Sequence, residues 1–459
     1  NDGNFVCDGL FWPDRTPHPA MWEAKRLFQP FDAAVVDQKL RIHNKYDVRD
    51  LAHLEIRWKV SVDGTVVESG VLPTLSTGPG VVESIDVPWS TPALTQGQEA
   101  FALLTFHDET GHEVGWTQHA IGSTEAGTAS PDLTSTAPAP EGVTVTESDD
   151  GWSIRGERFS VDVRRSDGAL TSWQVDGEQL LTAGPSPTVW RAPTDNDGIQ
   201  TLKVSWQADH QAMFRWKAAG LDRLTAHPTE VAVTDDGKGR AIVSRSVRYV
   251  PEDAQAGYTH RERLVVASDG TIDATHEFVI DEGLPDLARV GVVATVPAGF
   301  ERLEWFGRGP HESYVDRKAG AAIDRWGGTV DAQYVPYIFP QEHGNKTDLR
   351  WLSLRREDGV GLLVSAVGGA TEGGGDGLLQ GKASHYSDEV LTKATHTVEL
   401  ERSEEVFLAI DARQRGLGGA SCGPDTLERY RIPSGTTYTL RYRLLPLAPD
   451  DDPAVLHRS

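Results

Sequence analysis

LEIRWKVSVDGTVV, residues 54–67, is the stretch that best indicates how this chain folds. Leucine, isoleucine, tryptophan and two valines alternate with charged or polar residues, and this period of two is typical of a strand with one buried and one solvated face. Asp63 and Gly64 interrupt the alternation, which then resumes. An Asp-Gly pair between two such runs predicts a tight β-hairpin. The stretch therefore indicates antiparallel β-structure.

The surrounding sequence extends this pattern into a domain. Further strands are predicted over residues 35–43, 81–87, 99–106 and 114–121. About seven short strands between residues 29 and 121 are typical of an immunoglobulin-like β-sandwich. We therefore expect residues 29–121 to form such a sandwich.

Residues 1–28 do not share the alternating pattern. The run TPHPAMWEAKRLF predicts a helix that ends near residue 28, with Thr16 as its cap and Pro17 at the first helical position. A single helix cannot bury its own apolar face, so we expect Met21 and Trp22 to need a partner layer. Residues 1–28 are therefore interpreted as the end of another domain.

The sequence after the sandwich changes twice. Residues 122–142 are rich in Ser, Thr, Ala and Pro and are predicted to be a linker. Residues 143–459 contain long strand patterns separated by turn pairs such as Asp167-Gly168, with one helix expected over 203–220. Because helices do not alternate with these strands, we expect one large antiparallel supersandwich rather than a parallel sheet.

Composition limits the possible partners. The 459 residues include 44 Lys and Arg against 68 Asp and Glu, a net charge of −24. Such a surface repels phosphate backbones and anionic lipid, so nucleic acid and membrane partners are not expected. The two cysteines, Cys7 and Cys422, make no disulfide framework and favour a cytoplasmic protein. The 13 tryptophans suit a protein that binds carbohydrate.

No familiar catalytic motif is present, but four polar clusters stand out. Residues 195–198, DNDG, suit either a cation-binding loop or a structured turn. Residues 307–326 hold several Asp, Glu and Arg side chains, as an ion-paired loop or a site would. Residues 334–351 place aromatic rings beside charged groups, which fits sugar recognition or a buried corner. Residues 416–426, GLGGASCGPDT, allow close backbone approach to a pocket or a tight turn.

Taken in order, these stretches resemble one family. FVCDGLFWPDRTPHPAMWEAK, WRAPTDNDG, RWKAAG, GRGPHESYVDRKAGAAIDRW, YVPYIFPQEHGN and GLGGASCGPDT are similar to the C-terminal part of the β-galactosidases of glycoside hydrolase family 2, the large lac-operon type. The resemblance covers nearly the whole chain. It implies that residues 1–28 are the last loop and helix of a (β/α)8 barrel and that residues 143–459 are galactose-mutarotase-like.

The resemblance also implies an activity. The family hydrolyses terminal β-D-galactosides such as lactose with retention, using two Glu, one as nucleophile and one as acid/base. The resemblance places both upstream of residue 1, so no catalytic residue is expected in this segment. The family's magnesium ligands are likewise expected upstream. The N-terminal domains of the same polypeptide are then the first partner, and homo-oligomers are common in the family.

Some site residues carry over to this chain. The backbone carbonyl of Phe5, together with Asp8, matches the positions that hold a monovalent cation, Na⁺ or K⁺, beside the galactose 6-hydroxyl, although the family has Asn in place of Asp8. Phe339 and Leu391 match a second Na⁺ site made by backbone oxygens.

Two further positions face the substrate by the same resemblance. Gly198 belongs to a mobile loop that closes toward the active site. Cys422 lies where the family carries a Trp that stacks on the non-galactose sugar, so a wider mouth and weaker aglycone preference are expected.

Two other functions remain open from the residues. The chain could be a stand-alone carbohydrate-binding protein. It could also be an aldose 1-epimerase-like enzyme related to mutarotases, with acid and base drawn from His311, Glu312, Glu342 and His343. General acid/base work on a sugar ring needs such groups to converge within hydrogen-bond reach of the substrate.

Overall fold

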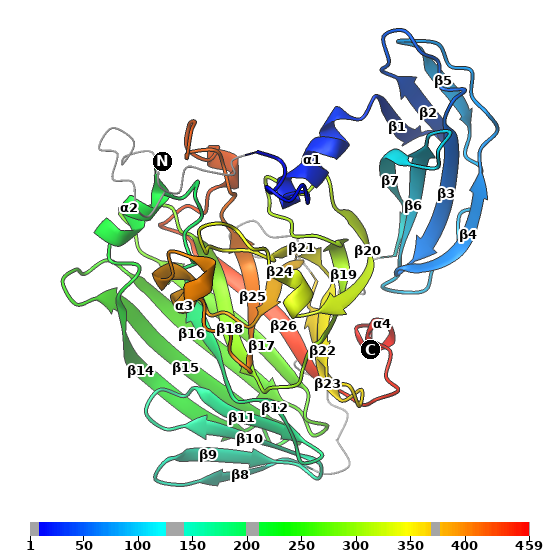
Figure 1. The fold of residues 1–459 in the computed structure, drawn as a ribbon. Coiled ribbons are helices and arrows are strands. Elements are labelled where there is room, and N and C mark those ends of the chain that lie inside the picture. Colours follow the sequence, from blue (N-terminus) through cyan, green and yellow to red (C-terminus); the bar gives the residue numbers. More distant parts are fainter. Residues whose placement is uncertain (1–8, 125–141, 199–210, 369–376, 459) are drawn as a thin grey trace.

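The computed structural model describes residues 9–124, 142–198, 211–368 and 377–458. Within these ranges the protein is mainly β, with 26 strands, four short α-helices and three 3-10 turns, as the sequence predicts. Figure 1 shows a small sandwich, at the upper right in blue and cyan, which joins a larger β body through α1 (Pro19–Phe28). None of the helices in the described ranges is long and apolar enough to cross a membrane.

The predicted N-terminal helix is present as α1 (Pro19–Phe28), but it starts later than expected. Pro19 takes the first helical position and His18 is the N-cap residue. Thr16 is therefore not the cap, because its N–H and hydroxyl both donate to Asp14 Oδ1, at 2.9 and 2.7 Å. Phe28 at the end of α1 is 84% exposed, so part of the helix's apolar face lies uncovered in this chain.

The small sandwich consists of two antiparallel sheets, with strand orders β1-β2-β5 and β4-β3-β6-β7. Their inner faces share one core that includes Phe31, Trp58 and Phe106. The predicted hairpin is confirmed, since Val62 pairs with Thr65. The strands are β1 (Phe31–Val36), β2 (Lys39–Asn44), β3 (Glu55–Val62), β4 (Thr65–Val71), β5 (Val82–Asp86), β6 (Glu99–His107) and β7 (Glu113–Ser123).

The single strand predicted over residues 35–43 is wrong. The chain reverses there, and β1 pairs with β2 through a two-residue turn at Asp37 and Gln38. Both residues have positive φ, 50° and 59°, the backbone that a tight hairpin turn requires. Because neither residue is Gly or Asn, the sequence carries no strong turn signal at this position.

The larger body contains three antiparallel sheets. The first has the order β12-β11-β10-β9-β8 and the second β13-β18-β25-β24-β21. The strands of the first are β8 (Thr144–Glu147), β9 (Gly151–Arg155), β10 (Phe159–Arg164), β11 (Leu170–Val175) and β12 (Glu178–Leu181). Those of the second are β13 (Ala183–Thr188), β18 (Arg289–Val296), β21 (Lys346–Leu349), β24 (Leu379–Ser384) and β25 (Val406–Gln414).

The third sheet has nine strands in the order β14-β15-β16-β17-β26-β23-β22-β19-β20. One continuous core that includes Trp173, Val292 and Phe278 joins all three sheets, as a large sandwich requires. The strands are β14 (Leu224–Asp235), β15 (Ala241–Pro251), β16 (Tyr258–Val266), β17 (Ile272–Ile280), β19 (Arg302–Gly309), β20 (Ala322–Thr329), β22 (Trp351–Arg355), β23 (Gly361–Ala366) and β26 (Thr437–Leu447).

Short helices lie in the connections of the larger body. They are α2 (Ala212–Ala218), α3 (Asp388–Lys393), α4 (Pro453–Leu456), η1 (Asp331–Gln333), η2 (Thr397–Glu399) and η3 (Glu428–Tyr430). The helix predicted over 203–220 is found in its described part as α2, which ends before Gly220 at a φ of 74°. Most of the predicted linker and residues 203–210 lie outside the described residues.

The small sandwich and α1 are both joined to the larger body by polar contacts. Lys59 on β3 pairs with Asp324 on β20 at 2.8 Å. The carboxylate of Glu23 on α1 accepts hydrogen bonds from the backbone N–H groups of Ala319 and Gly320, at 3.1 and 2.6 Å. These contacts hold residues 9–28 against the 307–326 segment, and that placement creates the candidate site.

Candidate functional site

A cavity of about 400 Å³ lies where segments distant in sequence meet. Its walls come from residues 9–20, 194–196, 312–342 and 417–422. These are the N-terminal segment and parts of the four polar clusters that stand out in the sequence. The larger body thus brings parts of all four clusters to one cavity.

The loop at residues 194–198 is anchored by an ion pair that solvent does not reach. Arg191 donates to both carboxylate oxygens of Asp197, at 3.0 and 2.8 Å, and both side chains are fully buried. The N–H of Thr194 donates to the same carboxylate at 3.0 Å. Because Asp197 is already neutralised by Arg191, the structured turn is favoured over a cation-binding loop.

Gly198 closes the same loop, and a side chain there would be crowded. Its φ is 155°, and a Cβ at this position would lie 3.0 Å from the Cε atom of Met213. Gly198 is buried, so it does not itself face the cavity. Its predicted contact with substrate stays a prediction.

The tip of the loop is bound to its neighbours. Asn196 donates to the carbonyl of Gly418 at 3.0 Å and accepts from the hydroxyl of Ser421 at 2.6 Å. Asp195 exchanges two hydrogen bonds with the side-chain amide of Gln341, at 3.1 and 3.0 Å. In this structure the loop is therefore closed against the Gly-rich loop, residues 416–426, on one side and the aromatic segment, residues 334–351, on the other.

The Gly-rich loop approaches Asp316 with its backbone. The carboxylate of Asp316 accepts from the N–H groups of Leu417 and Gly418, at 2.9 and 2.7 Å. A Cβ at Gly416 would lie 2.7 Å from that carboxylate, so the absence of a side chain is what permits the contact. Cys422, which is exposed and carries a free thiol, lies at the cavity wall. Its assignment to the wall of an aglycone pocket stays a prediction.

Glu312 at the cavity accepts three hydrogen bonds. It accepts from Arg317, from the hydroxyl of Tyr337 at 2.6 Å, and from the N–H of Gly344 at 2.7 Å. Burial alone would raise the pKa of Glu312, but Arg317 and these hydrogen bonds outweigh burial and lower it. The ion-paired interpretation of this segment is therefore correct for Glu312.

Two polar atoms at the same wall have no hydrogen-bond partner within the described residues. They are the hydroxyl of Tyr314, a side chain only 1% exposed, and the Nε atom of Arg317. Both residues line the cavity. An unpaired buried donor is costly to leave unsatisfied, so these atoms are available to a polar ligand or to water.

Aromatic rings from the N-terminal segment complete the wall. The ring centroids of Trp12 and His18 lie 3.6 Å apart, and Trp12 lies 5.9 Å from Tyr337. Aromatic faces beside hydrogen-bonding groups suit a sugar ring. Sequence reasoning missed Trp12 and His18 as site residues. The signal was present in WPDRTPH, but no local pattern says that this segment meets the loops of the larger body.

The four residues considered for an epimerase do not form a free acid/base pair. Glu342 binds Lys382 at 2.5 Å inside the protein. The pKa of His343 is lowered by burial and by Lys382. Burial also lowers the pKa of His311 to about 4, and its ring stacks on Trp22 at 5.6 Å. Because these groups are already engaged, general acid/base work by them is not supported.

The predicted cation ligands can be placed only in part. Phe5 and Asp8 lie outside the described residues. Phe339 lines the cavity, and its carbonyl accepts from Gln341 at 2.9 Å, which leaves that oxygen a second lone pair. Leu391 lies in the last turn of α3, where helix carbonyls lack intrahelical partners. The assignment of these two carbonyls to one Na⁺ site stays a prediction.

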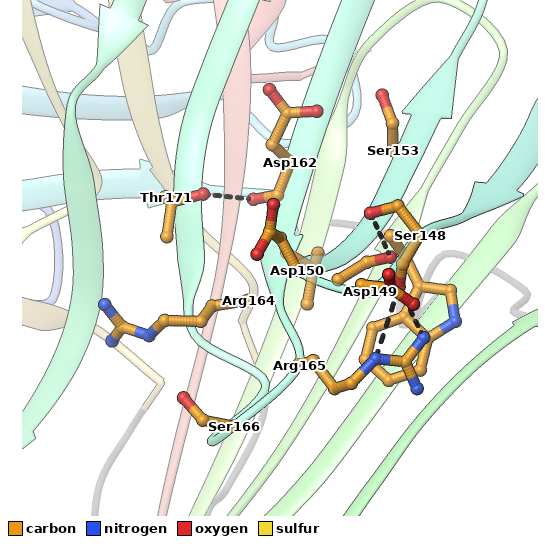
Figure 2. A pocket seen from close by; sticks show the side chains of 12 residues that line it. Ser148, Asp149, Asp150, Ser153, Asp162, Arg164, Arg165, Ser166 and Thr171 are labelled. Carbon is orange, nitrogen blue, oxygen red and sulfur yellow. Dashed lines mark hydrogen bonds between the residues drawn. The ribbon is translucent and has the colours of Figure 1, made fainter.

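A second cleft, of about 690 Å³, lies on the β8–β11 side of the larger body and contains none of the predicted site residues. Figure 2 shows its side chains. The guanidinium of Arg165 covers the ring of Trp152 at 4.8 Å and donates to the carbonyl of Ser148. One face of the Trp152 indole is therefore already covered by Arg165.

Comparison with known proteins agrees with the segments quoted from the sequence. Residues 155–444 match the family model described as "Beta galactosidase small chain", and residues 40–122 match "Beta-galactosidase, domain 4". A curated β-galactosidase of Vibrio cholerae is 32% identical over 435 residues, which is 91% of this chain and 39% of that protein. One of Priestia megaterium is 28% identical over 459 residues, 97% of this chain and 41% of that protein.

The chain therefore spans about two fifths of the length of these curated relatives. Among solved structures, a putative aldose 1-epimerase of Escherichia coli K12 is similar over 66% of this chain and 99% of its own, with 10% identity and a TM-score of 0.31. The galactose 1-epimerase of Lactobacillus acidophilus is similar over 66% and 98%, with 10% identity and a TM-score of 0.28. Scores this low do not inform the function.

Proposed function

The chain belongs to the β-galactosidase small-chain family, and on that premise we propose that it forms the C-terminal part of a retaining β-galactosidase that acts on terminal β-D-galactosides such as lactose. One observation carries the proposal: the N-terminal segment, the 194–198 loop and the Gly-rich loop line a single cavity. A shared cavity is what three parts of an active-site rim would form.

The catalytic pair belongs, in this proposal, to the rest of the polypeptide. A retaining glycosidase needs two carboxyl groups about 5–5.5 Å apart, both able to reach the scissile bond. The carboxylates of Glu312 and Glu342 at this cavity are instead engaged by Arg317 and Lys382. The N-terminal domains of the same polypeptide would supply the nucleophile and the acid/base.

The roles of the rim residues follow from their positions. Cys422 would form the aglycone wall, where a small side chain leaves a wide mouth. The 194–198 loop with Gly198 would gate the mouth, and the hydrogen bond between Asn196 and Ser421 would hold the gate closed. Trp12 lines the same cavity and offers an aromatic face beside Tyr337.

The metal positions are also proposals. The carbonyl of Phe5 and the carboxylate of Asp8 would hold Na⁺ or K⁺ beside the galactose, and Phe339 and Leu391 would hold a second Na⁺ through backbone oxygens. A bound monovalent cation supplies a positive charge that orients substrate hydroxyls. The magnesium ligands would lie in the rest of the polypeptide.

The remaining assignments concern the whole protein. We assign residues 1–28 to the end of a (β/α)8 barrel, 29–121 to the immunoglobulin-like domain, 122–142 to the linker and 143–459 to the supersandwich. The exposed end of α1 suits contact with the rest of such a barrel. A cytoplasmic homo-oligomer is the expected assembly.

Hydrolysis of o-nitrophenyl β-D-galactoside tests the proposal. The isolated chain should be inactive, and activity should appear when it is joined to the N-terminal polypeptide of its own source. Hydrolysis by the isolated chain, or an assembled enzyme that prefers β-glucosides, would contradict it. Galactose mutarotation by the isolated chain would support the epimerase instead. That function and a stand-alone carbohydrate-binding role are not favoured, since the curated relatives are β-galactosidases.

A further inference from the structure

Three side chains with metal-binding chemistry converge away from the cavity. Glu301 lies just before β19, Asp331 begins η1, and His385 follows β24. Their ligand atoms all lie within 4.8 Å of one another. His385 Nε2 is 3.0 Å from Glu301 Oε2 and 3.9 Å from Asp331 Oδ1. Two ligands of one tetrahedral Zn²⁺ are separated by about 3.3 Å, given bond lengths of about 2.0–2.2 Å, so the three atoms have suitable spacing.

The imidazole of His385 is already arranged as a metal ligand. Its side chain is 1% exposed, and its Nδ1 lies 3.2 Å from the carbonyl of Glu405. A carbonyl only accepts hydrogen bonds, so Nδ1 carries the proton and Nε2 presents a lone pair. Metal-binding histidines are commonly fixed in this way, by donating the other ring N–H to a carbonyl.

The Nε2 atom of His385 faces a conflict that a cation resolves. With a lone pair on Nε2, the oxygen of Glu301 at 3.0 Å is a second acceptor and no proton lies between them. Protonating Nε2 would instead oppose the guanidinium of Arg402, whose Nη2 lies 2.9 Å away. With the lone pair on Nε2, Arg402 donates to it and also approaches Glu301 at 3.4 Å, so a cation already lies between these two acceptors.

A positive charge occupies the centre of the cluster in this structure. Arg402 donates to both carboxylate oxygens of Asp331 at 3.0 Å, approaches Glu301 at 3.4 Å, and contacts His385. Its side chain is 39% exposed, so it can swing into solvent. Glu301 and Asp331 carry two negative charges, which one divalent ion balances when Arg402 leaves.

We propose that Glu301, Asp331 and His385 form a binding site for a divalent transition-metal ion such as Zn²⁺, which displaces the guanidinium of Arg402. One imidazole with two carboxylates is a donor set that Zn²⁺ accepts, and water completes the coordination. Asp331 opens η1, which leads into the aromatic segment that lines the cavity. The ion would therefore fasten the base of that segment to β19 and β24.

A second cluster of similar composition lacks these features. His260, Glu262 and His276 are also close together but lie deep in the core. Arg245 already neutralises Glu262 with two hydrogen bonds of 2.8 Å and is itself 5% exposed, so it has no path to solvent. A divalent ion there would leave uncompensated charge in the interior.

Isothermal titration with ZnCl2 of the whole chain, freed of metal beforehand, tests the proposal. We expect His385→Gln to weaken zinc binding by about 100-fold. Arg402→Met should strengthen it by about tenfold, because it removes the competing charge. Both cysteines remain in every variant, so any contribution from them is common to all.

His396→Gln is the matched control, because the exposed pair of His396 and Glu399 has a similar contact of 3.1 Å. It should leave zinc affinity unchanged. Thermal melting gives a second measurement: zinc should raise the Tm of the native chain and not that of His385→Gln. Equal affinity in the native chain and His385→Gln would overturn the proposal, as would a failure of Arg402→Met to bind zinc.

Discussion

The side-chain oxygen of Asn196 accepts a hydrogen bond from the hydroxyl of Ser421 at 2.6 Å, although the two residues are 225 positions apart in the sequence. The same oxygen accepts from the N–H of Ser421, and the amide of Asn196 donates to Gly418. The 194–198 loop and the Gly-rich loop thus form one continuous wall of the cavity. Within the described residues, the hydrogen bonds that join the tips of the two loops all involve one asparagine, whereas Arg191 joins their bases through the carbonyls of Arg415 and Gly416.

Asn196→Ala should open this wall. It removes three hydrogen bonds, each with a net value of about 0.5–1.5 kcal/mol, and the half-exposed position places the total near 1–2 kcal/mol. Hydrogen exchange at residues 194–198 and 416–422 should become about tenfold faster. Ser421→Ala keeps the bond to Gly418 and should have a smaller effect. Unchanged exchange in Asn196→Ala would show that other contacts hold the loops together.

Arg191→Ala should destabilise the chain far more than loss of a surface ion pair does. It leaves Asp197 buried with Arg415 at 3.5 Å as its remaining charged partner, and breaking a buried pair costs about 3–5 kcal/mol. Urea unfolding measures the difference. Arg158→Ala is the control, because Arg158 and Asp176 are 70% and 47% exposed and such pairs contribute about 1 kcal/mol or less. Equal effects would contradict the role given to the buried pair.

The fold class followed from local patterns, and the errors have local causes. Alternation with Asp63 and Gly64 identified the first hairpin, because both residues suit a tight turn. Asp37 and Gln38 form an equivalent turn without that signal, so one strand was predicted where two exist. Thr16 was misassigned as a helix cap because Asp14 competes for its hydrogen bonds.

The candidate site was only partly predictable. The polar clusters are visible in the sequence, but their convergence depends on long-range contacts such as Glu23 with Gly320. The cation-binding roles of Phe5, Asp8, Phe339 and Leu391 came from the family resemblance and stay predictions. The proposed metal site could not be predicted from spacing. Its outermost residues, Glu301 and His385, are 84 positions apart in the sequence, and no spacing rule links them to Asp331.

Cys422→Trp should tighten binding of the non-galactose sugar in the assembled enzyme. Cys422 is exposed at the cavity wall, so an indole has room, and stacking on a sugar is worth about 1 kcal/mol. The KM for lactose should fall about fivefold with little change for o-nitrophenyl galactoside. Cys422→Ser should match the native enzyme. If Cys422→Trp left both the KM for lactose and the ratio of sugar transfer to hydrolysis unchanged, Cys422 would not be part of the aglycone wall.

Acid should destabilise the chain below pH 6.5 through its buried histidines. Burial and Arg245 lower the pKa of His276 to about 3. The unfolded chain therefore binds a proton as pH falls through 6.5 while the folded chain does not, and stability is lost between pH 6.5 and 3. His276→Gln should reduce the slope of unfolding free energy by about 1.4 kcal/mol per pH unit near pH 5. A slope unaffected by His276→Gln would contradict the prediction.

Gly320→Ala should loosen α1 from the larger body. A Cβ at Gly320 would lie 2.7 Å from the backbone carbon and oxygen of Trp22, and backbone atoms cannot yield as a flexible side chain can. The helix must move, which weakens the bonds from Glu23 and costs about 1–3 kcal/mol.

Gly368→Ala is the matched control for this change, because nothing lies within 4 Å of its Cβ position. Differential scanning calorimetry should show a lower Tm for Gly320→Ala alone, and acrylamide quenching of tryptophan fluorescence should increase as Trp22 is released from His311. Since α1 carries the N-terminal segment to the cavity, the assembled enzyme should also lose activity. A native Tm together with native quenching would mean that α1 is not held by this contact.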